Sequence, residues 1–436
     1  MLEGHEIAII GIPTRFGTPN DYSVDTPYYL RTLGIVGQLE RNGAKVSDIG
    51  DVICAEGESQ STGNVSEKNV DRVFDISQKT ANLVAEQIRT KKKVLAIGGD
   101  HSMSIGTILG ALEACNGDLG VIWIDTHGDI NTHKTTLTGN IHGMPVAVLM
   151  GLGHAKLRKI FEGRPTLKPE NILYVGIHEE DLDPAEKKLL ADKKISLAPA
   201  AEVRDWHGSR ETIKKINELC RRVGNVWVSF DVDVLDKNNA PGTPMENPDG
   251  LWPGHIRDIL YHIASQTQVV GMDIAELMPA NDENQITGNL AIELATLALD
   301  EGNGSAKFLS RSLQEAYPPI RTREDFLNFV GFGEFFSGPK DMQFQLIKWE
   351  KIANSRHLGP LSLNVQTLGM DARLYDLFKE FYYIAIGRVI TPGQYQEVIE
   401  WIAALKMAQT RRIGVREMLQ ILVPSFMRST LQRFLQ

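Results

Sequence analysis

The 436-residue chain has little cysteine, no excess of basic charge and no long apolar run. Its three cysteines, Cys54, Cys115 and Cys220, are too few and too widely spaced for a disulfide framework or a thiolate zinc site. A net charge of −9 argues against a nucleic-acid-binding protein, because such proteins usually carry an excess of lysine and arginine. No stretch approaches the roughly 18 apolar residues that a membrane helix needs.

The start of the chain also lacks the basic residues and the apolar stretch of a signal peptide. With so few cysteines, this predicts a reducing, cytoplasmic setting, with neither a membrane nor a nucleic acid as partner. The chain does have enough apolar sequence for a core, since 42% of its residues are apolar and 23% are charged. Its length allows one large domain and a smaller one.

Short β-rich apolar runs alternate with helical patterns up to about residue 305. Among the helical stretches are residues 70–89, 209–222 and 255–264. Nearly continuous apolar strands are typical of a parallel sheet that is buried on both faces. The alternation therefore predicts a doubly wound α/β domain, whose ligands gather beyond the carboxyl ends of the strands. The predicted strands are residues 7–12, 94–97, 121–124, 172–177, 226–230 and 269–274.

The composition changes after about residue 305. Residues 311–436 carry a net charge of +4, whereas residues 1–310 carry −13. The C-terminal stretch also holds 17 of the 31 aromatic residues. We therefore predict two units: a catalytic domain, residues 1–305, and a mostly helical, aromatic-rich extension, residues 306–436, that acts in assembly or regulation.

Three polar blocks follow the predicted strands at 94–97, 121–124 and 226–230. In an extended backbone, alternate side chains point to the same face of the strand. We therefore expect the acidic and histidine side chains of each block to point to one face and to meet at the strand ends. The candidate ligands are His101, Asp125, His127, Asp129, Asp231 and Asp233.

Four carboxylates and two imidazoles, without a thiolate, suit manganese or magnesium better than a structural zinc ion. Two divalent ions held close together generate hydroxide near neutral pH, which predicts a hydrolase. Each block alone is also compatible with a structural turn. Three such blocks at the ends of strands in one α/β order favour a metal centre.

With these blocks, the chain resembles the arginase–agmatinase family of ureohydrolases over roughly residues 5–303. The resemblance implies a three-layer αβα arginase-like fold with a mainly parallel sheet. It also implies a hydrolase that cleaves the guanidinium group of L-arginine to give L-ornithine and urea. The matching blocks are residues 98–102, 125–132, 139–143, 229–233 and 271–276.

The resemblance further implies two Mn²⁺ ions per subunit and a bridging hydroxide that attacks the guanidinium carbon. The two ions share two bridging aspartates in this pattern. The implied ligands are His101, Asp125, Asp129 and Asp231 for one ion, and Asp125, His127, Asp231 and Asp233 for the other.

Two further residues match catalytic positions of the family. His142 matches a histidine that shuttles a proton, which a leaving amine needs near pH 7. Glu276 matches a glutamate that holds the planar guanidinium. The ligand Asp129 is counted with these two among the catalytic residues.

The substrate contacts implied by the resemblance lie on two loops. Asn131, Thr138 and Asn140 fall where arginases contact the substrate carboxylate, and Asp183 matches an aspartate that binds the α-ammonium group. Asp183 also precedes Pro184, a pattern typical of a helix N-cap, and the two roles are compatible.

The resemblance implies a small guanidino substrate and a homo-oligomer, a trimer or a hexamer. Residues 178–180 lengthen the segment before Asp181, so another guanidino compound, such as agmatine or guanidinobutyrate, is the alternative substrate. A non-catalytic regulatory protein on the same fold is the alternative of a different class.

Overall fold

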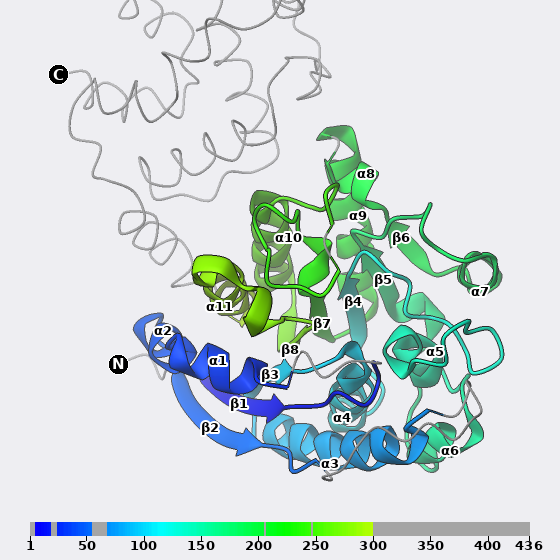
Figure 1. Ribbon diagram of the computed structural model, residues 1–436, viewed down its shortest axis with the longest axis horizontal. Helices are drawn as coiled ribbons and strands as arrows, with labels where there is room; N and C mark the ends of the chain where they lie inside the picture. Colours follow the sequence, from blue (N-terminus) through cyan, green and yellow to red (C-terminus); the bar gives the residue numbers. More distant parts are fainter. Residues whose placement is uncertain (1–4, 19–23, 55–67, 205, 246, 300–436) are drawn as a thin grey trace, which may run out of the picture. The chain divides into compact units, whose positions relative to one another are not determined.

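A computed structural model describes residues 5–18, 24–54, 68–204, 206–245 and 247–299. These residues form one twisted sheet with helices on both faces (Figure 1). The predicted boundary at residue 305 and the predicted helical extension, residues 306–436, lie outside the described residues. No helix in the described ranges is both long enough and apolar enough to cross a membrane.

The sheet has eight strands in the order β2-β1-β3-β8-β7-β4-β5-β6, and every neighbouring pair is parallel. All six predicted strands are present, and the predicted α/β fold with a parallel sheet is confirmed. The strands are β1 (Glu6–Ile12), β2 (Lys45–Asp51), β3 (Lys93–Gly98), β4 (Gly120–Ile124), β5 (Ile172–Val175), β6 (Ser196–Ala198), β7 (Asn225–Asp231) and β8 (Gln268–Ala275).

The two strands at the edges of the sheet, β2 and β6, were not predicted. β2 has only partly or fully exposed residues, and β6 has only three residues. The middle strands are buried on both faces, which explains their nearly continuous apolar sequences. Edge strands carry no such apolar run, so their sequences resemble loops.

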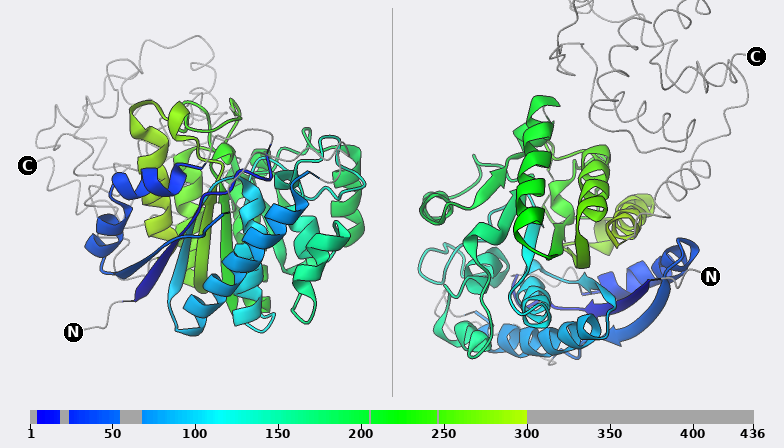
Figure 2. Two further views of the ribbon diagram at one scale, coloured as in Figure 1. Left: turned by 60° about the horizontal axis from the view of Figure 1, so that its bottom comes forward. Right: turned by 180° about the vertical axis from the view of Figure 1, so that it is seen from behind.

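Helices cover the sheet on both sides (Figures 1 and 2). On one face α3 packs against α4, and on the other α10 packs against α11. The predicted helix 70–89 matches α3 end to end, and every third or fourth residue of it is buried. The helices are α1 (Thr26–Thr32), α2 (Ile35–Arg41), α3 (Val70–Arg89), α4 (Ser104–Ala114), α5 (Pro145–Leu149), α6 (Ala155–Arg158), α7 (Pro184–Lys193), α8 (Ala200–Arg204), α9 (Trp206–Arg222), α10 (Pro253–Gln266) and α11 (Ile286–Leu299).

The candidate site residues lie at the carboxyl ends of four neighbouring strands. β3, β8, β7 and β4 are the four consecutive middle strands of the sheet. His101 follows β3, Asp125 follows β4, Asp231 ends β7 and Glu276 follows β8. Because all four strands are parallel, their carboxyl ends meet at the same edge of the sheet, where α/β proteins bind ligands.

Candidate metal centre

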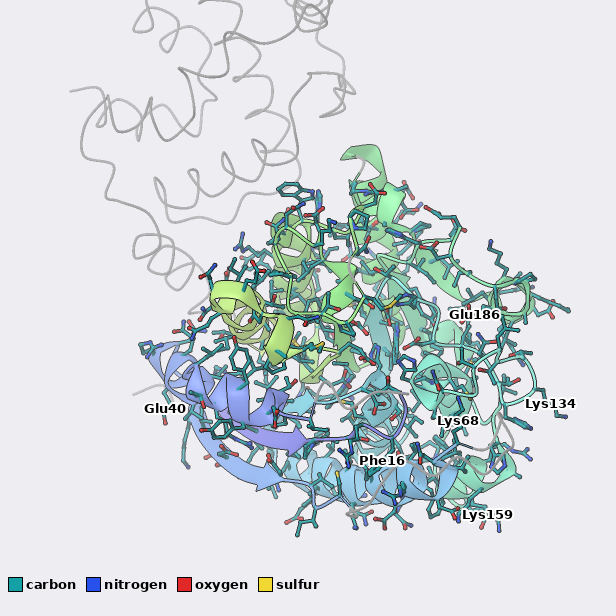
Figure 3. All side chains as sticks on the ribbon, viewed as in Figure 1. Phe16, Glu40, Lys68, Lys134, Lys159 and Glu186 are labelled. Carbon is teal, nitrogen blue, oxygen red and sulfur yellow. The ribbon has the colours of Figure 1, made fainter. Side chains whose placement is uncertain are left out.

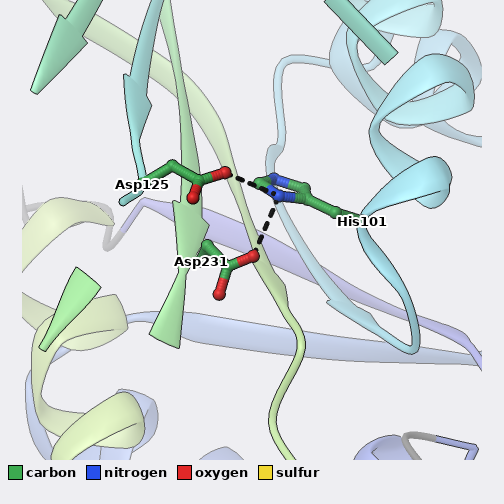
Figure 4. A group of neighbouring side chains, drawn as sticks. All are labelled: His101, Asp125 and Asp231. Carbon is green, nitrogen blue, oxygen red and sulfur yellow. Dashed lines mark ion pairs between the residues drawn. The ribbon is translucent and has the colours of Figure 1, made fainter. Parts of the chain in front are cut away.

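His101 faces three carboxylates at once. It begins a short 3₁₀ helix, His101–Met103, directly after the Gly98-Gly99-Asp100 turn. Its Nδ1 lies 3.1 Å from an Oδ2 atom of each of Asp125, Asp129 and Asp231. Figure 4 shows two of these carboxylates pointing at the imidazole from separate strands. Although it is buried, Nδ1 makes no hydrogen bond, so this nitrogen is free to bind a cation.

The second histidine shares a carboxylate with the first. His127 Nδ1 lies 3.1 Å from Asp233 Oδ2 and 3.6 Å from Asp125 Oδ1. The two oxygens of Asp125 therefore face different histidines. His101, Asp125 and Asp231 form one group able to hold an ion, and Asp125, His127 and Asp233 form another. The geometry thus describes two adjoining sites with Asp125 between them.

The route by which these side chains converge differs from the prediction. Residues 125–129 are not extended: the chain bends at Thr126 and His127, and Asp129 has a φ of 46°. Asp231 ends β7, whereas Asp233 lies in a 3₁₀ helix, Val232–Val234. The expectation that a strand period of two aligns these ligands was therefore wrong.

Hydrogen bonds from the backbone to the ligands themselves produce the bends. The N–H of His127 donates to Asp125 Oδ1 at 2.7 Å, and the N–H of Asp233 donates to Asp231 Oδ1 at 2.9 Å. A carboxylate that accepts a bond from the residue two positions ahead turns the chain. In this way each aspartate both supplies a ligand and folds the segment that carries the next one.

The electrostatics of the cluster favour a bound cation. Burial raises the pKa of Asp231 well above its usual range, and the charges of Asp233 and Asp125 raise it further. Burial and the Asp125 charge raise the pKa of Asp129 to about 6. Burial lowers the pKa of His101, but the facing carboxylates outweigh it and raise this pKa well above the usual value. The cluster thus binds protons tightly, and a divalent cation would replace them and relieve the repulsion between carboxylates.

The residues fit a divalent metal pair by their chemistry as well. They offer only carboxylate oxygens and imidazole nitrogens, a set that suits manganese, magnesium or zinc. His101 Nδ1 and Asp233 Oδ1 are buried without a hydrogen-bond partner. The 3.1 Å spacing of the ligand atoms around His101 is also that of neighbouring ligands of a small cation, whose bonds are about 2.1 Å long.

The predicted proton shuttle and guanidinium acceptor lie beside the cluster. His142 is on a 3₁₀ helix, Ile141–Gly143, and its Nδ1 is 3.1 Å from Glu276 Oε1. The same oxygen accepts the N–H of His101 at 2.9 Å, whereas Glu276 Oε2 is buried without a partner. Burial lowers the pKa of His142, but Glu276 outweighs it, and with Asp129 and Asp100 raises this pKa to about 9. A protonated imidazole and an open carboxylate oxygen therefore stand side by side.

A loop that the sequence did not single out holds His142 in place. Asp100 Oδ2 accepts the N–H of Gly17 at 3.0 Å, and the Gly17 carbonyl accepts the N–H of His142 at 3.0 Å. A Cβ on Gly99 would lie 1.8 Å from the Thr14 carbonyl oxygen, so only glycine lets this loop approach. In the sequence, Asp100 of the Gly-Gly-Asp-His block was the available signal for this loop. Its role became recognisable only once the structure showed its bond with Gly17.

The predicted substrate-binding residues fall into two groups. Asn131 Nδ2 donates to Asp183 Oδ2 at 2.8 Å, and Asp183 Oδ1 caps α7 by accepting the N–H groups of Ala185 and Glu186. The predicted N-cap is therefore confirmed, and it uses only one of the two Asp183 oxygens.

Thr138 and Asn140 form the other group, joined by Lys68. Its Nζ donates to the Thr138 carbonyl at 2.7 Å and to Asn140 Oδ1 at 3.4 Å. Figure 3 shows Lys68 and Glu186 on the same side of the domain, opposite Glu40. The substrate contacts of all four predicted residues stay predictions.

Comparison with known proteins agrees with this geometry. The model of the arginase family matches residues 5–299. The arginase of Bacillus caldovelox is 32% identical over 289 residues, which cover 66% of this chain and 96% of the relative. Its crystal structure superposes with a TM-score of 0.63 over 68% of this chain and 99% of its own. A formimidoylglutamase structure from Bacillus subtilis, 21% identical with a TM-score of 0.54, shows the shared fold alone.

The predicted family and the predicted enzyme class are thereby confirmed for the part of the chain that carries the metal centre. The match spans the strand-end blocks from the Gly-Gly-Asp-His turn to Glu276. The chain belongs to the arginase family and is an arginase-like ureohydrolase.

Proposed function

We propose that the chain is a two-manganese hydrolase that converts L-arginine to L-ornithine and urea. The observation that supports this most directly is the pair of adjoining ligand groups that share Asp125, beside His142 and Glu276. When bound, two divalent ions supply hydroxide near neutral pH.

The proposed ligand sets follow the geometry of the cluster. One ion would be held through His101 Nδ1 and the three carboxylates that surround it. The other would be held around His127, with Asp125 and Asp231 common to both sites. The two Asp125 oxygens, one toward each histidine, support its bridging role. The ligands are His101, Asp125, Asp129 and Asp231 for the first ion, and Asp125, His127, Asp231 and Asp233 for the second.

Three side chains would bind the guanidinium group and transfer protons. Glu276 Oε2, buried without a partner, is an acceptor for a planar guanidinium, which a carboxylate binds strongly. His142 carries a proton at neutral pH and would donate it to the leaving amine. Asp129 lies against His101 Nδ1 at 3.1 Å, and while it holds the first ion it would accept a proton from the attacking water.

Substrate choice rests on the rim of the site. Asp183 Oδ2 accepts a bond from the Asn131 amide and takes no part in the cap of α7, so it is suited to an α-ammonium group. Thr138 and Asn140 are uncharged and would donate hydrogen bonds to the substrate carboxylate. The alternative is a substrate without the α-carboxylate, such as agmatine or guanidinobutyrate. It is supported by the acidic insertion at residues 178–180, which lengthens the segment before Asp181. In this segment His178 Nδ1 lies 3.4 Å from Asp181 Oδ2. A cytoplasmic location and a homotrimer or homohexamer belong to this proposal.

A urea-release assay over a panel of guanidino compounds tests the proposal. The protein is loaded with manganese and offered L-arginine, agmatine and guanidinobutyrate, with a chelator-treated sample as the control. We expect the highest kcat/KM for L-arginine. A preference for agmatine would overturn the substrate assignment but not the chemistry. No urea from any compound, with manganese bound, would favour the non-catalytic regulator.

A further inference from the structure

A buried carboxylate behind the metal centre takes no part in the function described so far. Asp273 is in the middle of β8 and is fully buried. It is paired in register with Ser229 of the neighbouring strand β7, and Ser229 Oγ donates to Asp273 Oδ1 at 2.7 Å. The other oxygen, Oδ2, accepts bonds from Trp227 Nε1 at 2.8 Å and from Thr107 Oγ1 at 2.5 Å. Asp273 is thus held by three donors.

Ser229 connects this carboxylate to a metal ligand. Its Oγ lies 3.0 Å from His101 Nε2 and 3.1 Å from Ser104 Oγ. The chain of contacts therefore runs from Asp273 through Ser229 to the imidazole whose other nitrogen faces three aspartates. The His101 ring is also stacked on Trp123, with centroids 4.2 Å apart and an angle of 16° between the planes. The imidazole consequently cannot turn without breaking both contacts.

The number of available protons sets the direction of each hydrogen bond between Asp273, Ser229 and His101. An ionised carboxylate can only accept, so the single hydroxyl proton of Ser229 is committed to Asp273. Ser229 Oγ must then accept from its other two neighbours. Ser104 donates one bond, and His101 Nε2 must carry the proton that forms the other. With its proton on Nε2, the neutral imidazole presents an unprotonated Nδ1 to the aspartates.

We infer that Asp273 is a positioning residue that acts through Ser229 to hold His101 in the tautomer that binds metal. Metal-ligating histidines generally donate their second ring N–H to an outer partner, which fixes the tautomer and the ring orientation. Here the outer partner is a serine, and the serine is itself oriented by a carboxylate. The inference rests on the metal centre of the proposed function and not on the identity of the guanidino substrate.

The substitution Asp273→Asn tests the direction of the chain. Trp227 and Thr107 both donate to Oδ2, so the amide oxygen of the asparagine would turn toward them. Its NH₂ group would then donate to Ser229 and release the serine proton toward His101 Nε2. That arrangement opposes the tautomer with a free Nδ1. We expect manganese binding at one of the two sites to weaken by about 10- to 100-fold, the usual cost of losing an outer partner.

The measurement is the affinity of the full-length, metal-free protein for Mn²⁺, by competition with a chromophoric chelator that resolves two dissociation constants. The matched control is Thr107→Val, which removes a donor from the far oxygen of Asp273 but leaves its bond with Ser229. We expect this control to bind manganese as the wild type does. Circular dichroism establishes that each variant is folded.

A double-mutant cycle separates positioning from a general structural effect. Ser229→Ala removes the hydroxyl that links Asp273 to His101, and we expect it to weaken manganese binding at the same site. In the Ser229→Ala background, Asp273→Asn should cost no further affinity, because contacting residues that act as a unit are not additive. An equal cost in both backgrounds would mean that Asp273 acts by another route and would overturn the inference.

The outcomes distinguish the inference from the proposed function. A wild-type protein that binds no manganese overturns the metal centre and the inference together. Manganese bound normally by wild type and by folded Asp273→Asn overturns the inference alone. If Asp273→Asn does not fold, Ser229→Ala decides instead: unchanged manganese affinity in that variant refutes an action of Asp273 through Ser229.

Discussion

The shared carboxylate offers the sharpest test of the two-ion arrangement. Asp125 presents Oδ2 to His101 Nδ1 at 3.1 Å and Oδ1 to His127 Nδ1 at 3.6 Å. Of these two histidines, Asp233 faces His127, at 3.1 Å. We therefore expect Asp125→Asn to weaken both ions and Asp233→Asn to weaken one. The two variants remove the same charge from the same cluster, so the number of ions lost reports the bridging position itself.

The expected magnitude follows from the contacts of Asp125. Outer partners of metal ligands typically cost about 10- to 100-fold in affinity, so loss of a direct anionic ligand should exceed about 100-fold, or about 2.7 kcal/mol, at each ion. An asparagine would also point its NH₂ group at one of two donors, Trp123 Nε1 or the His127 N–H, which now donate to the carboxylate. A donor left buried without an acceptor costs about 1–3 kcal/mol more.

The assay is the manganese content after gel filtration, together with a titration of the metal-free protein. We expect about two ions in the wild type, fewer than one in Asp125→Asn and one in Asp233→Asn. Circular dichroism controls for folding. If Asp125→Asn kept one ion at wild-type affinity, Asp125 would not bridge, and the assignment of the two sites would have to be revised.

Three further predictions concern the surroundings of the site. Gly17→Ala would place a Cβ 2.1 Å from Asp100 Oδ1 and so displace the loop that holds His142. We expect kcat to fall by about 10- to 100-fold at unchanged manganese content. Gly143→Ala, whose Cβ meets nothing within 4 Å, should leave kcat unchanged. Burial raises the pKa of Glu186 to about 7, above its unfolded value. The metal-free wild type should therefore lose up to about 3 kcal/mol of stability as pH rises from about 4.5 through 7, and urea unfolding of Glu186→Gln should not show this loss. Trp123→Phe keeps a ring stacked on the His101 imidazole but loses the bond to Asp125. Chelator competition should therefore show manganese binding about 10- to 100-fold weaker, and wild-type affinity would contradict this.

Much of the fold could be predicted because burial on both faces leaves a strong mark on the sequence. β3, β4, β7 and β8 are nearly continuous apolar runs, and each ends at a polar part of the site. β2 was missed because as an edge strand it packs only partly, so nothing requires its residues to be apolar. β6 is too short, at three residues, to show a period of its own.

The candidate site could be predicted in its residue types but not in its local shape. The six candidate ligands and the His142–Glu276 pair were all named from motifs, and the structure brings them together. The bends that aim His127 and Asp233 come from backbone bonds to the preceding aspartates, which a strand period cannot anticipate. The N-cap at Asp183 was predictable because a cap depends only on residues within the next turn.

The sequence by itself determined the order of the six inner strands along the chain, the donor atoms of the candidate metal centre and the family. These follow from local patterns: apolar runs, caps, and the donor atoms that each motif offers. Only the tertiary structure decided which strands are neighbours, that Asp125 stands between two histidines, and that Asp273 reaches His101 through Ser229. The physical reason is that the contacts of His101 with Asp125, of Ser229 with Asp273 and of His101 with Ser229 join residues 24, 44 and 128 positions apart. Parallel pairing of β3, β8, β7 and β4 brings these residues together.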